Sequence, residues 1–241
     1  MDVAERAGEH QWYHSLELGP DYLTPGVFDL RSEVESYHLP ARLDGVRALD
    51  VGTWDGFWAF EMERRGASVV ALDLDDESRL DTPVRRKGDN SFSTRPRGDG
   101  FRLAREILGS KVERVDMSLY DATSAELGTF DLVFCGSVVI HLRDQLLALE
   151  RIAELCTGTF ITAEAYTRGL GLLPFAATRY VADRPSAVVY WQPNVRAWKQ
   201  MLWTAGFNTV EEVERFAMHS TQGYKVRHVV HHASDSAHHG P

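Results

Sequence analysis

Short apolar runs alternate with amphipathic stretches along most of this chain. Four runs have the length and apolar content of buried strands, at 46–51, 68–74, 130–136 and 158–166. A more polar strand is predicted at 111–120. Amphipathic spacing predicts helices between the strands, at 57–66, at 100–109 and from Leu142 to Ile152. Strands that alternate with helices favour a parallel sheet covered by helices on both faces.

The last third of the chain changes this alternation. A long helix is predicted at 194–207, followed by two β-rich stretches at 209–219 and 224–232. The two stretches are close enough in sequence to pair as an antiparallel hairpin at the sheet edge. The predicted fold class is therefore α/β, with a doubly wound, mostly parallel seven-stranded sheet and antiparallel C-terminal strands. One domain is expected over 1–228, followed by a flexible, His-rich tail at 229–241.

Composition narrows the classes of partner. The 241 residues carry a formal net charge of -9, which argues against a general nucleic-acid or membrane-surface binder while leaving room for a local basic patch. Cys135 and Cys156 do not form a C-x-x-C pair, so neither a metal site nor a disulfide is expected. The chain has no apolar run near the roughly 20 residues that span a bilayer, and its acidic start lacks a signal-peptide core. A cytoplasmic location without a membrane partner is the expectation.

The segment that follows the first strand, Asp50-Val51-Gly52-Thr53-Trp54-Asp55-Gly56, has the spacing of a nucleotide-binding turn. A dinucleotide fingerprint needs glycine where this chain has Trp54 and Phe57, and no phosphate-binding G-K-[ST] occurs. An adenosine ligand without phosphates remains, which points to S-adenosylmethionine. Gly52 and Gly56 supply the close turn, and Asp50 is the predicted acidic partner of the cofactor ammonium, directly or through water.

Carboxylates after the next two strands fit the rest of this cofactor. Asp73 ends the second strand 21 residues after Gly52, where a carboxylate accepts hydrogen bonds from both ribose hydroxyls. Asp121 is predicted to contact the adenine amino group, and Asp116 takes that role if the third strand ends earlier. Each acid alone has a surface carboxylate as its alternative interpretation, but three in register are much less expected by chance. The full predicted cofactor set is Asp50, Gly52, Thr53, Gly56, Asp73, Leu74, Leu119, Tyr120, Asp121, Cys135 and Gly136.

Four segments carry a family resemblance: "WYHSLELGPDYLTPGVFDLR", "LDVGTWDGFWAFEMERRGA", "FDLVFCGSVVIHLRD" and "QPNVRAWKQMLWTAGF". They resemble the class I S-adenosylmethionine-dependent methyltransferases that include the bacterial tRNA wobble-uridine (carboxy)methyltransferases, over roughly residues 12 to 218. The resemblance implies that Asp50, Gly52, Asp73 and Asp121 bind the cofactor. It also implies that residues 12–45 form a lid over it.

Two departures separate this chain from the tRNA enzymes. Their N-terminal region holds a lysine for the extra carboxylate of their cofactor, whereas this chain is expected to begin almost at the Trp-Tyr-His motif. They also have a tyrosine before the histidine that follows the fourth strand, where this chain has Ile140 before His141. The expectation is ordinary S-adenosylmethionine, with a small-molecule acceptor favoured over tRNA.

Methyl transfer from a sulfonium requires the enzyme to align the nucleophile with the methyl group and to exclude water. It requires a base only when the nucleophile carries a proton. The candidate catalytic residues are His14, His141 and Glu164. For His141 the alternative is a helix-start histidine bonded to backbone, and for His14 a packing role within the N-terminal segment. Glu164 ends an otherwise apolar strand at the ligand-bearing edge, which favours a functional role.

A basic segment contrasts with the acidic remainder of the chain. Residues 79–105 hold eight Lys or Arg and three Asp, and the insertion at 76–99 within this region is expected to be mobile. A solvated loop is the simpler interpretation; the functional one is a flap that recognises an anionic group through arginine. A second insertion at 166–191 is expected to shape the acceptor pocket. The predicted acceptor-binding residues are Tyr13, Tyr166, Arg168 and Arg179.

Three functional hypotheses follow from the sequence. The favoured one is a methyltransferase acting on a small, anionic molecule. The second is a tRNA-modifying enzyme, which needs a continuous basic face. The third is a catalytically silent protein that binds S-adenosylmethionine. The sequence leaves a homodimer open and predicts no metal.

Overall fold

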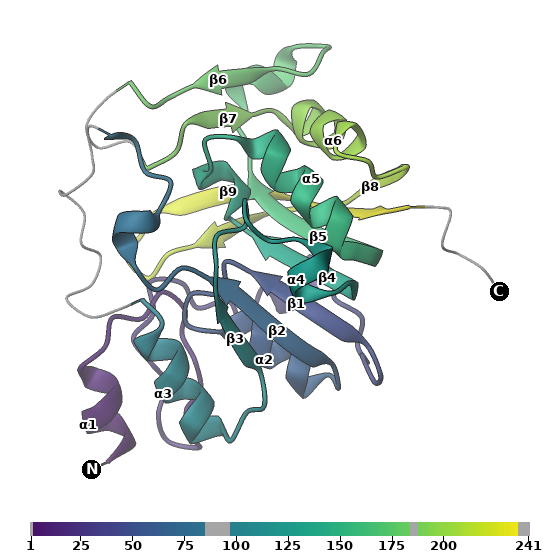
Figure 1. Ribbon diagram of the computed structural model, residues 1–241. Helices are drawn as coiled ribbons and strands as arrows, with labels where there is room; N and C mark the ends of the chain where they lie inside the picture. The colour runs from purple at the N-terminus through teal and green to yellow at the C-terminus, as the bar shows by residue number, and fades with distance from the viewer. Residues whose placement is uncertain (1, 85–96, 184–187, 236–241) are drawn as a thin grey trace.

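A computed structural model describes residues 2–84, 97–183 and 188–235 of the chain. Its described strands form a seven-stranded sheet in the order β3-β2-β1-β4-β5-β9-β8 and a separate two-stranded sheet of β6 and β7 (Figure 1). The strand bounds are β1 Arg47–Val51, β2 Ser68–Asp73, β3 Glu113–Asp116, β4 Phe130–Gly136, β5 Cys156–Ala165, β6 Thr178–Tyr180, β7 Trp191–Pro193, β8 Thr209–His219 and β9 Lys225–Ser234.

Helices connect the strands of the large sheet. Their bounds are α1 Val3–Gly8, α2 Phe57–Arg64, α3 Asp99–Leu108, α4 Ser124–Leu127, α5 Gln145–Leu155 and α6 Val195–Thr204. Short 3-10 helices occupy Val34–Tyr37 (η1), Glu77–Arg79 (η2), Val139–His141 (η4) and Gly169–Leu172 (η5). None of the helices in the described ranges is long and apolar enough to cross a membrane.

The sheet confirms the predicted fold class. Strands β3, β2, β1, β4 and β5 are parallel, with Leu49 of β1 opposite Val70 of β2 and Val133 of β4. The chain order reverses between β1 and β4, which is where such sheets bind ligands at the carboxyl ends of their strands. Strand β9 runs antiparallel to both β5 and β8. The predicted C-terminal hairpin is therefore present, with β9 inserted beside β5 and β8 alone at the edge.

Two sequence predictions about strand ends are wrong. The segment 229–241 was expected to be a flexible tail, but β9 continues to Ser234 and pairs with β5 from His228 to Ser234. Its histidines look polar in sequence, yet His231 is buried because β9 lies between two other strands. The third strand was expected to reach residue 120, but β3 ends at Asp116. Residues 236–241 lie outside the described part of the chain.

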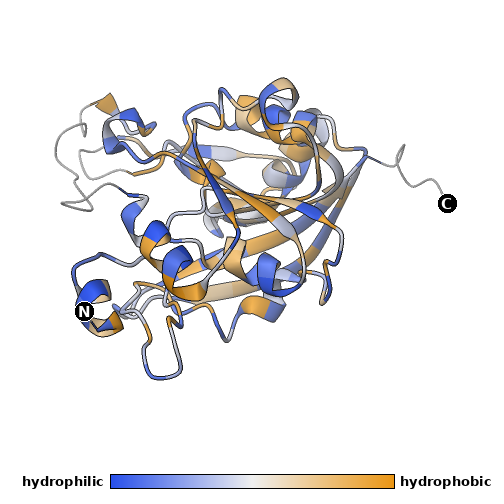
Figure 2. Ribbon diagram, turned by 60° about the horizontal axis from the view of Figure 1, so that its bottom comes forward, coloured by the Kyte–Doolittle hydropathy of each residue, from blue (hydrophilic) through white to orange (hydrophobic). Residues whose placement is uncertain are grey.

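Alternation along the strands separates two apolar cores. On one face, α2, α3 and the N-terminal segment pack together around Phe57, Trp58 and Phe101. On the other face, α5 and α6 pack around Leu149 and Trp198. Figure 2 shows both hydrophilic and hydrophobic residues along the helices, as expected for helices that bury one face. Both faces of the parallel strands are thus covered, and the strand ends are left to form the site.

The N-terminal segment crosses the carboxyl-end region of the sheet. His14 forms a β-bridge with Phe28, and Phe28 forms another with Ser220, just after β8. The insertion at 166–191 contributes η5, β6 and the start of β7, which the sequence pattern did not predict. The N-terminal segment and the insertion at 166–191 therefore both form regular structure. Their predicted roles as a lid and as part of the acceptor pocket stay predictions.

Candidate active site

The loops after β1 and β4 contact each other directly. Gly52 has φ 74° and its N–H donates to Leu72 O at 2.7 Å. A β-carbon at Gly52 would lie 2.3 Å from Cγ2 of Val138, so a larger residue does not fit there. Gly56 has φ 95°, and a β-carbon there would lie 2.4 Å from the Phe60 ring. The turn is thus a close backbone approach made possible by two glycines.

Asp50 is buried beneath this turn. Asp50 as a whole residue is 2% exposed. Its Oδ2 makes no hydrogen bond with the described residues. Burial raises the pKa of Asp50 to about 7, although the Thr53 side chain favours the ionised form. A buried carboxylate with one oxygen lacking a hydrogen bond, next to a glycine turn, fits the ammonium of an amino acid, which would supply the missing charge-assisted hydrogen bond.

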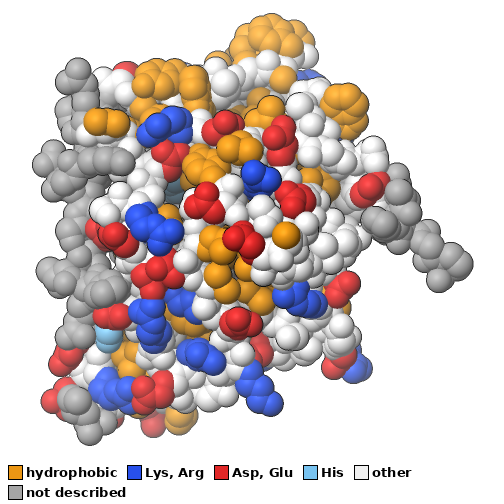
Figure 3. Space-filling view, in the orientation of Figure 1, with side chains coloured by type: hydrophobic (Ala, Val, Ile, Leu, Met, Phe, Trp, Pro, Cys, Tyr) orange, Lys and Arg blue, Asp and Glu red, His pale blue; other side chains and the backbone are white. Residues whose placement is uncertain are grey.

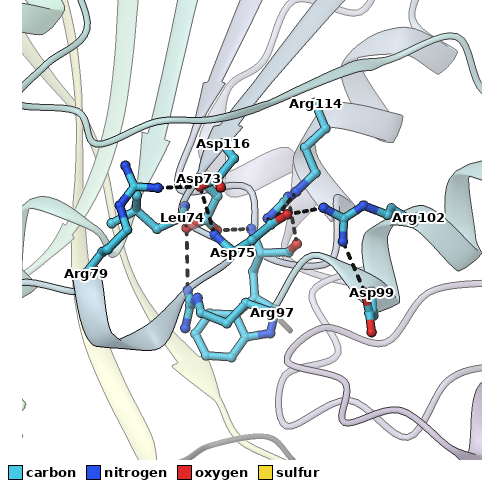
Figure 4. Close-up of polar contacts among 10 residues, drawn as sticks. Asp73, Leu74, Asp75, Arg79, Arg97, Asp99, Arg102, Arg114 and Asp116 are labelled. Atoms are coloured by element: carbon cyan, nitrogen blue, oxygen red, sulfur yellow. Dashed lines mark hydrogen bonds and ion pairs between the residues drawn. The ribbon is translucent and has the colours of Figure 1, made fainter. Parts of the chain in front are cut away.

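Asp73 lies at the end of β2 and holds the same turn. Its carboxylate accepts from the N–H of Trp54 and from the N–H of Leu74, each at 2.7 Å. The guanidinium of Arg97 lies 3.6 Å from Asp73 Oδ1 (Figure 4). Asp73 therefore has a structural role in the turn besides its predicted contact with the ribose.

Trp54, which replaces the expected glycine, lies in a stack of three side chains. Its ring is 4.8 Å from the Tyr13 ring at an angle of 27°. The Arg97 guanidinium lies over the Trp54 ring at 3.7 Å. Trp54 has φ 49°, an uncommon conformation for a residue with a β-carbon. The stacking joins the N-terminal segment, the glycine turn and the residues just before α3.

The residues predicted around the adenine lie after β3 but have different environments. Asp116 is the last residue of β3, and its Oδ1 accepts from the N–H of Asp75 at 3.1 Å. Leu119 is buried in the core, and Tyr120 donates its hydroxyl hydrogen to Asp81 at 2.7 Å. Asp121 is exposed, in the turn after Tyr120. Because β3 ends early, Asp116 is the acid at the strand end, while Asp121 has the freedom of an exposed loop side chain.

His14 and Asp55 form a buried pair at the same turn. His14 Nδ1 lies 2.5 Å from Asp55 Oδ1, while Asp55 Oδ2 accepts from the N–H groups of Tyr13 and His14. The carboxylate can only accept, so Nδ1 carries the hydrogen and Nε2 of a neutral ring is left as the base. The side chain of Asp55 thus orients His14 and attaches the N-terminal segment to the glycine turn.

Glu164 has three backbone partners. Its carboxylate accepts from the N–H groups of Val138, Val139 and Ile140 at 2.9 to 3.2 Å. Burial raises the pKa of Glu164 to about 7, while these three donors act in the opposite direction. The contacts fix the loop after β4 against β5. They give Glu164 a structural role that the sequence did not suggest, and its catalytic role stays a prediction.

The remaining predicted site residues are spread over the second insertion and its surroundings. His141 is exposed, with Nδ1 at 2.9 Å from Val188 O. Tyr166 is half-buried just after β5, and Arg215 lies 5.9 Å from its ring. Arg168 and Arg179 are both exposed. Cys135 is buried in the core at the end of β4, and Gly136 beside it is half-buried.

Described arginines of the basic segment face acidic side chains. Arg79 pairs with Asp116 at 3.2 Å, and Arg102 pairs with Asp75 and Asp99. Arg114, from β3, also contacts Asp75, at 2.7 Å (Figure 4). Of the eight basic positions of the segment, Arg85, Arg86, Lys87 and Arg95 lie outside the described residues. The described part of the segment neutralises Asp75, after β2, and Asp116, at the end of β3.

Three residues near the strand ends escaped the sequence analysis. Asp55 was treated only as a spacer in the glycine turn, although a carboxylate at that position is itself a signal. Ser137 follows β4, and its hydroxyl lies 2.7 Å from Nε2 of His228 on β9. Their separation of 91 residues explains why no local pattern connects them.

A methyltransferase domain family model matches residues 28–212. The chain belongs to this family. The match covers the glycine turn, the ends of β1 to β5 and α6, whereas Tyr13, His14 and His228 lie outside it. It supports the broad class of the resemblance, class I methyltransferases, and does not single out the tRNA wobble-uridine group.

Individual relatives of this methyltransferase domain are distant. The chain is 28% identical over 154 residues to the mitochondrial ubiquinone biosynthesis O-methyltransferase of Bos taurus, covering 61% of this chain and 36% of the relative. It is 26% identical over 140 residues to the ubiquinone biosynthesis O-methyltransferase of Vibrio parahaemolyticus serotype O3:K6, covering 53% and 52%. The chain thus spans about half or less of these relatives. A crystal structure of the N-terminal domain of EvdMO1 with SAH bound has the same fold, with a TM-score of 0.66, 17% identity and 98% of each chain covered.

Proposed function

We propose that this protein transfers a methyl group from S-adenosylmethionine to a small-molecule acceptor. The observation that carries the proposal is the buried Asp50 carboxylate, whose Oδ2 has no partner among the described residues, directly beneath the two-glycine turn. When bound, the cofactor supplies an electrophilic methyl group on its sulfonium. The chain supplies binding, alignment and exclusion of water.

We expect the predicted cofactor residues to hold the amino acid, ribose and adenine parts of the cofactor in turn. Asp50 with Gly52 and Thr53 would hold its amino acid end, and Asp73 would accept from the ribose hydroxyls. Leu74, Leu119, Tyr120 and Asp121 stand where the adenine is expected, and Cys135 with Gly136 ends the neighbouring strand. Arg97 lies against Asp73 and Trp54, so ribose binding at Asp73 requires this guanidinium to move.

Among the three catalytic candidates, we favour His14 as the base. Asp55 fixes its ring with Nδ1 protonated, which leaves Nε2 to take a proton from an acceptor hydroxyl. Glu164 is already engaged by three backbone N–H groups, and His141 is exposed. Tyr13, Tyr166, Arg168 and Arg179 remain the predicted acceptor contacts.

A small acceptor fits better than tRNA. Described arginines of the basic segment pair with acids, and Figure 3 shows acidic and basic side chains interleaved on the face in view. Among the described arginines, the same pairing weakens the support for an anionic acceptor. The relatives named as O-methyltransferases suggest a hydroxyl oxygen as the reacting atom. A cytoplasmic location and a homodimer stay predictions.

Calorimetry with S-adenosylhomocysteine tests the cofactor site. Asp73→Ala should weaken binding by about 1.5 to 3 kcal/mol because two charge-assisted hydrogen bonds to the ribose are lost. Asp131→Ala is the control and should bind like the wild-type protein, since it removes an exposed carboxylate near the amino end of β4, at the opposite edge of the sheet. The test of function is transfer of labelled methyl from the cofactor to total tRNA and to a metabolite extract. Labelled tRNA, or no binding of S-adenosylhomocysteine by the wild-type protein, would overturn the proposal.

A further inference from the structure

The backbone of Ser137 has a conformation that is energetically unfavourable for any residue with a β-carbon. It follows β4 directly and has φ 58°, in the left-handed region. Its N–H donates to Ala163 O at 2.9 Å, which holds the backbone in this turn. Glycine would meet the backbone requirement with less strain, so the serine side chain needs a reason of its own.

That side chain makes one directed hydrogen bond. Ser137 Oγ lies 2.7 Å from His228 Nε2, and His228 Nδ1 lies 3.1 Å from the carbonyl oxygen of Val226. A carbonyl oxygen only accepts, so Nδ1 carries the ring hydrogen. Burial lowers the pKa of His228 to about 4 and keeps the ring neutral. Nε2 is then an acceptor, and the hydrogen of Ser137 is committed to it.

The Ser137 hydroxyl, which donates its hydrogen to His228, can therefore only accept a hydrogen bond from a ligand. Ser137 is half-buried, and its neighbour Val138 touches the position where a Gly52 side chain would be. Ser137 therefore lies beside the turn that would hold the amino acid end of the cofactor. A ligand group that meets its oxygen lone pairs must bring a hydrogen of its own.

We propose that Ser137, oriented by His228, positions the methyl acceptor by accepting a hydrogen bond from a hydroxyl or N–H group next to the methylated atom. The acceptor class that follows is a molecule with a hydrogen-bond donor beside its nucleophile, such as a catechol or a vicinal diol. A carboxylate on the acceptor molecule is disfavoured at this position, because its oxygen lone pairs would face those of Ser137 Oγ without a hydrogen between them. This inference rests on the proposed methyltransferase function and adds the acceptor class to it.

Ligand binding and turnover together test the role of Ser137. In the full chain loaded with S-adenosylhomocysteine, catechol should perturb the His228 ring nitrogen signals, assigned with His228→Gln, whereas benzoate should not. Guaiacol, which lacks one donor of catechol, should perturb them less. With labelled S-adenosylmethionine, Ser137→Gly should lower kcat/KM for catechol by about 10- to 100-fold, as expected for one lost hydrogen bond.

Ser137→Gly also separates positioning from folding. Glycine suits φ 58°, so the variant should melt at or above the wild-type temperature and bind S-adenosylhomocysteine within about twofold. Ser137→Ala keeps the strain and should lose the same activity with a lower melting temperature. The inference is overturned if His228 carries its hydrogen on Nε2, if catechol leaves its signals unchanged, or if Ser137→Gly keeps wild-type kcat/KM. A wild-type protein that binds no S-adenosylhomocysteine would instead overturn the proposed function.

Discussion

At the scale of single residues, burial sets the chemistry of the site. Asp50 and Glu164 both lie in a dry environment that raises the pKa of each carboxyl to about 7. They differ in partners, because Glu164 accepts three backbone N–H groups while Asp50 Oδ2 accepts none among the described residues. The residue with unmet hydrogen-bonding capacity is the better candidate for contact with a ligand.

The pKa of Asp50 leads to a pH-dependent affinity for the cofactor. Only the ionised carboxylate pairs with an ammonium, so affinity for S-adenosylhomocysteine should fall as pH drops below about 7, by at most tenfold per pH unit. Asp50→Asn should bind more weakly and lose most of this dependence. Calorimetry between pH 5.5 and about 8.5 measures both.

Glu164→Gln is the control for this experiment. Its carboxyl has a similarly raised pKa but no predicted contact with the ammonium, so the pH profile should survive the substitution. A profile that is flat in the wild-type protein, or that disappears in Glu164→Gln instead of Asp50→Asn, would contradict the assignment.

At the scale of elements, the turn between β1 and α2 combines a strained tryptophan with two glycines. Trp54→Gly removes the stacking on Tyr13 and Arg97 and keeps the N–H that donates to Asp73. Affinity for S-adenosylhomocysteine should stay within about tenfold, and the melting temperature should fall because the lost packing outweighs the relief at φ 49°. Trp54→Ala keeps the strain and should be less stable than Trp54→Gly. Complete loss of binding by a folded Trp54→Gly would show that the ring contacts the cofactor.

Strand β9 adds a second prediction at this scale. His231 is buried, and burial lowers its pKa to about 4; Glu212, Lys199, Arg215 and His232 are the charged or titratable groups around it. The neutral ring is favoured in the folded state, so this residue destabilises the fold as pH falls from about 6.5 toward 4.

Urea denaturation of His231→Leu measures this contribution. The wild-type protein should lose stability relative to the variant over that pH range, by up to about 3 kcal/mol. His219→Gln replaces an exposed histidine on β8 and should track the wild-type protein. An equal pH response of the wild-type protein and His231→Leu would contradict the prediction.

At the scale of the whole molecule, charge distribution separates the two substrate classes. The chain has a net charge of -9, and described arginines of its basic segment are paired with acids after β2 and β3. In filter binding at about 0.15 M salt, tRNA should bind no more tightly than about 10 µM, as for non-specific contacts. Sub-micromolar binding with a steep salt dependence would restore the tRNA alternative. A basic nucleic-acid-binding protein in the same assay is the positive control.

The sequence by itself determined the sheet, the glycine turn and the position of Asp73 at the end of β2. These features are local: strand length, helical periodicity and the spacing of Gly52 and Asp73 are visible in the printed order of residues. The broad functional class followed from them because a turn that excludes phosphates still accepts an adenosine.

Only the tertiary structure decided which side chains meet. His14 with Asp55, Glu164 with the loop after β4, and Ser137 with His228 are joined across 24 to 91 residues of sequence. The position of β9 inside the sheet likewise depends on partners far along the chain, so the sequence predicted the hairpin but not the burial of His231 between β5 and β8. Burial, tautomer and the shifted pKa values arise from these long-range contacts, because each depends on the dielectric and the partners that folding brings to a side chain.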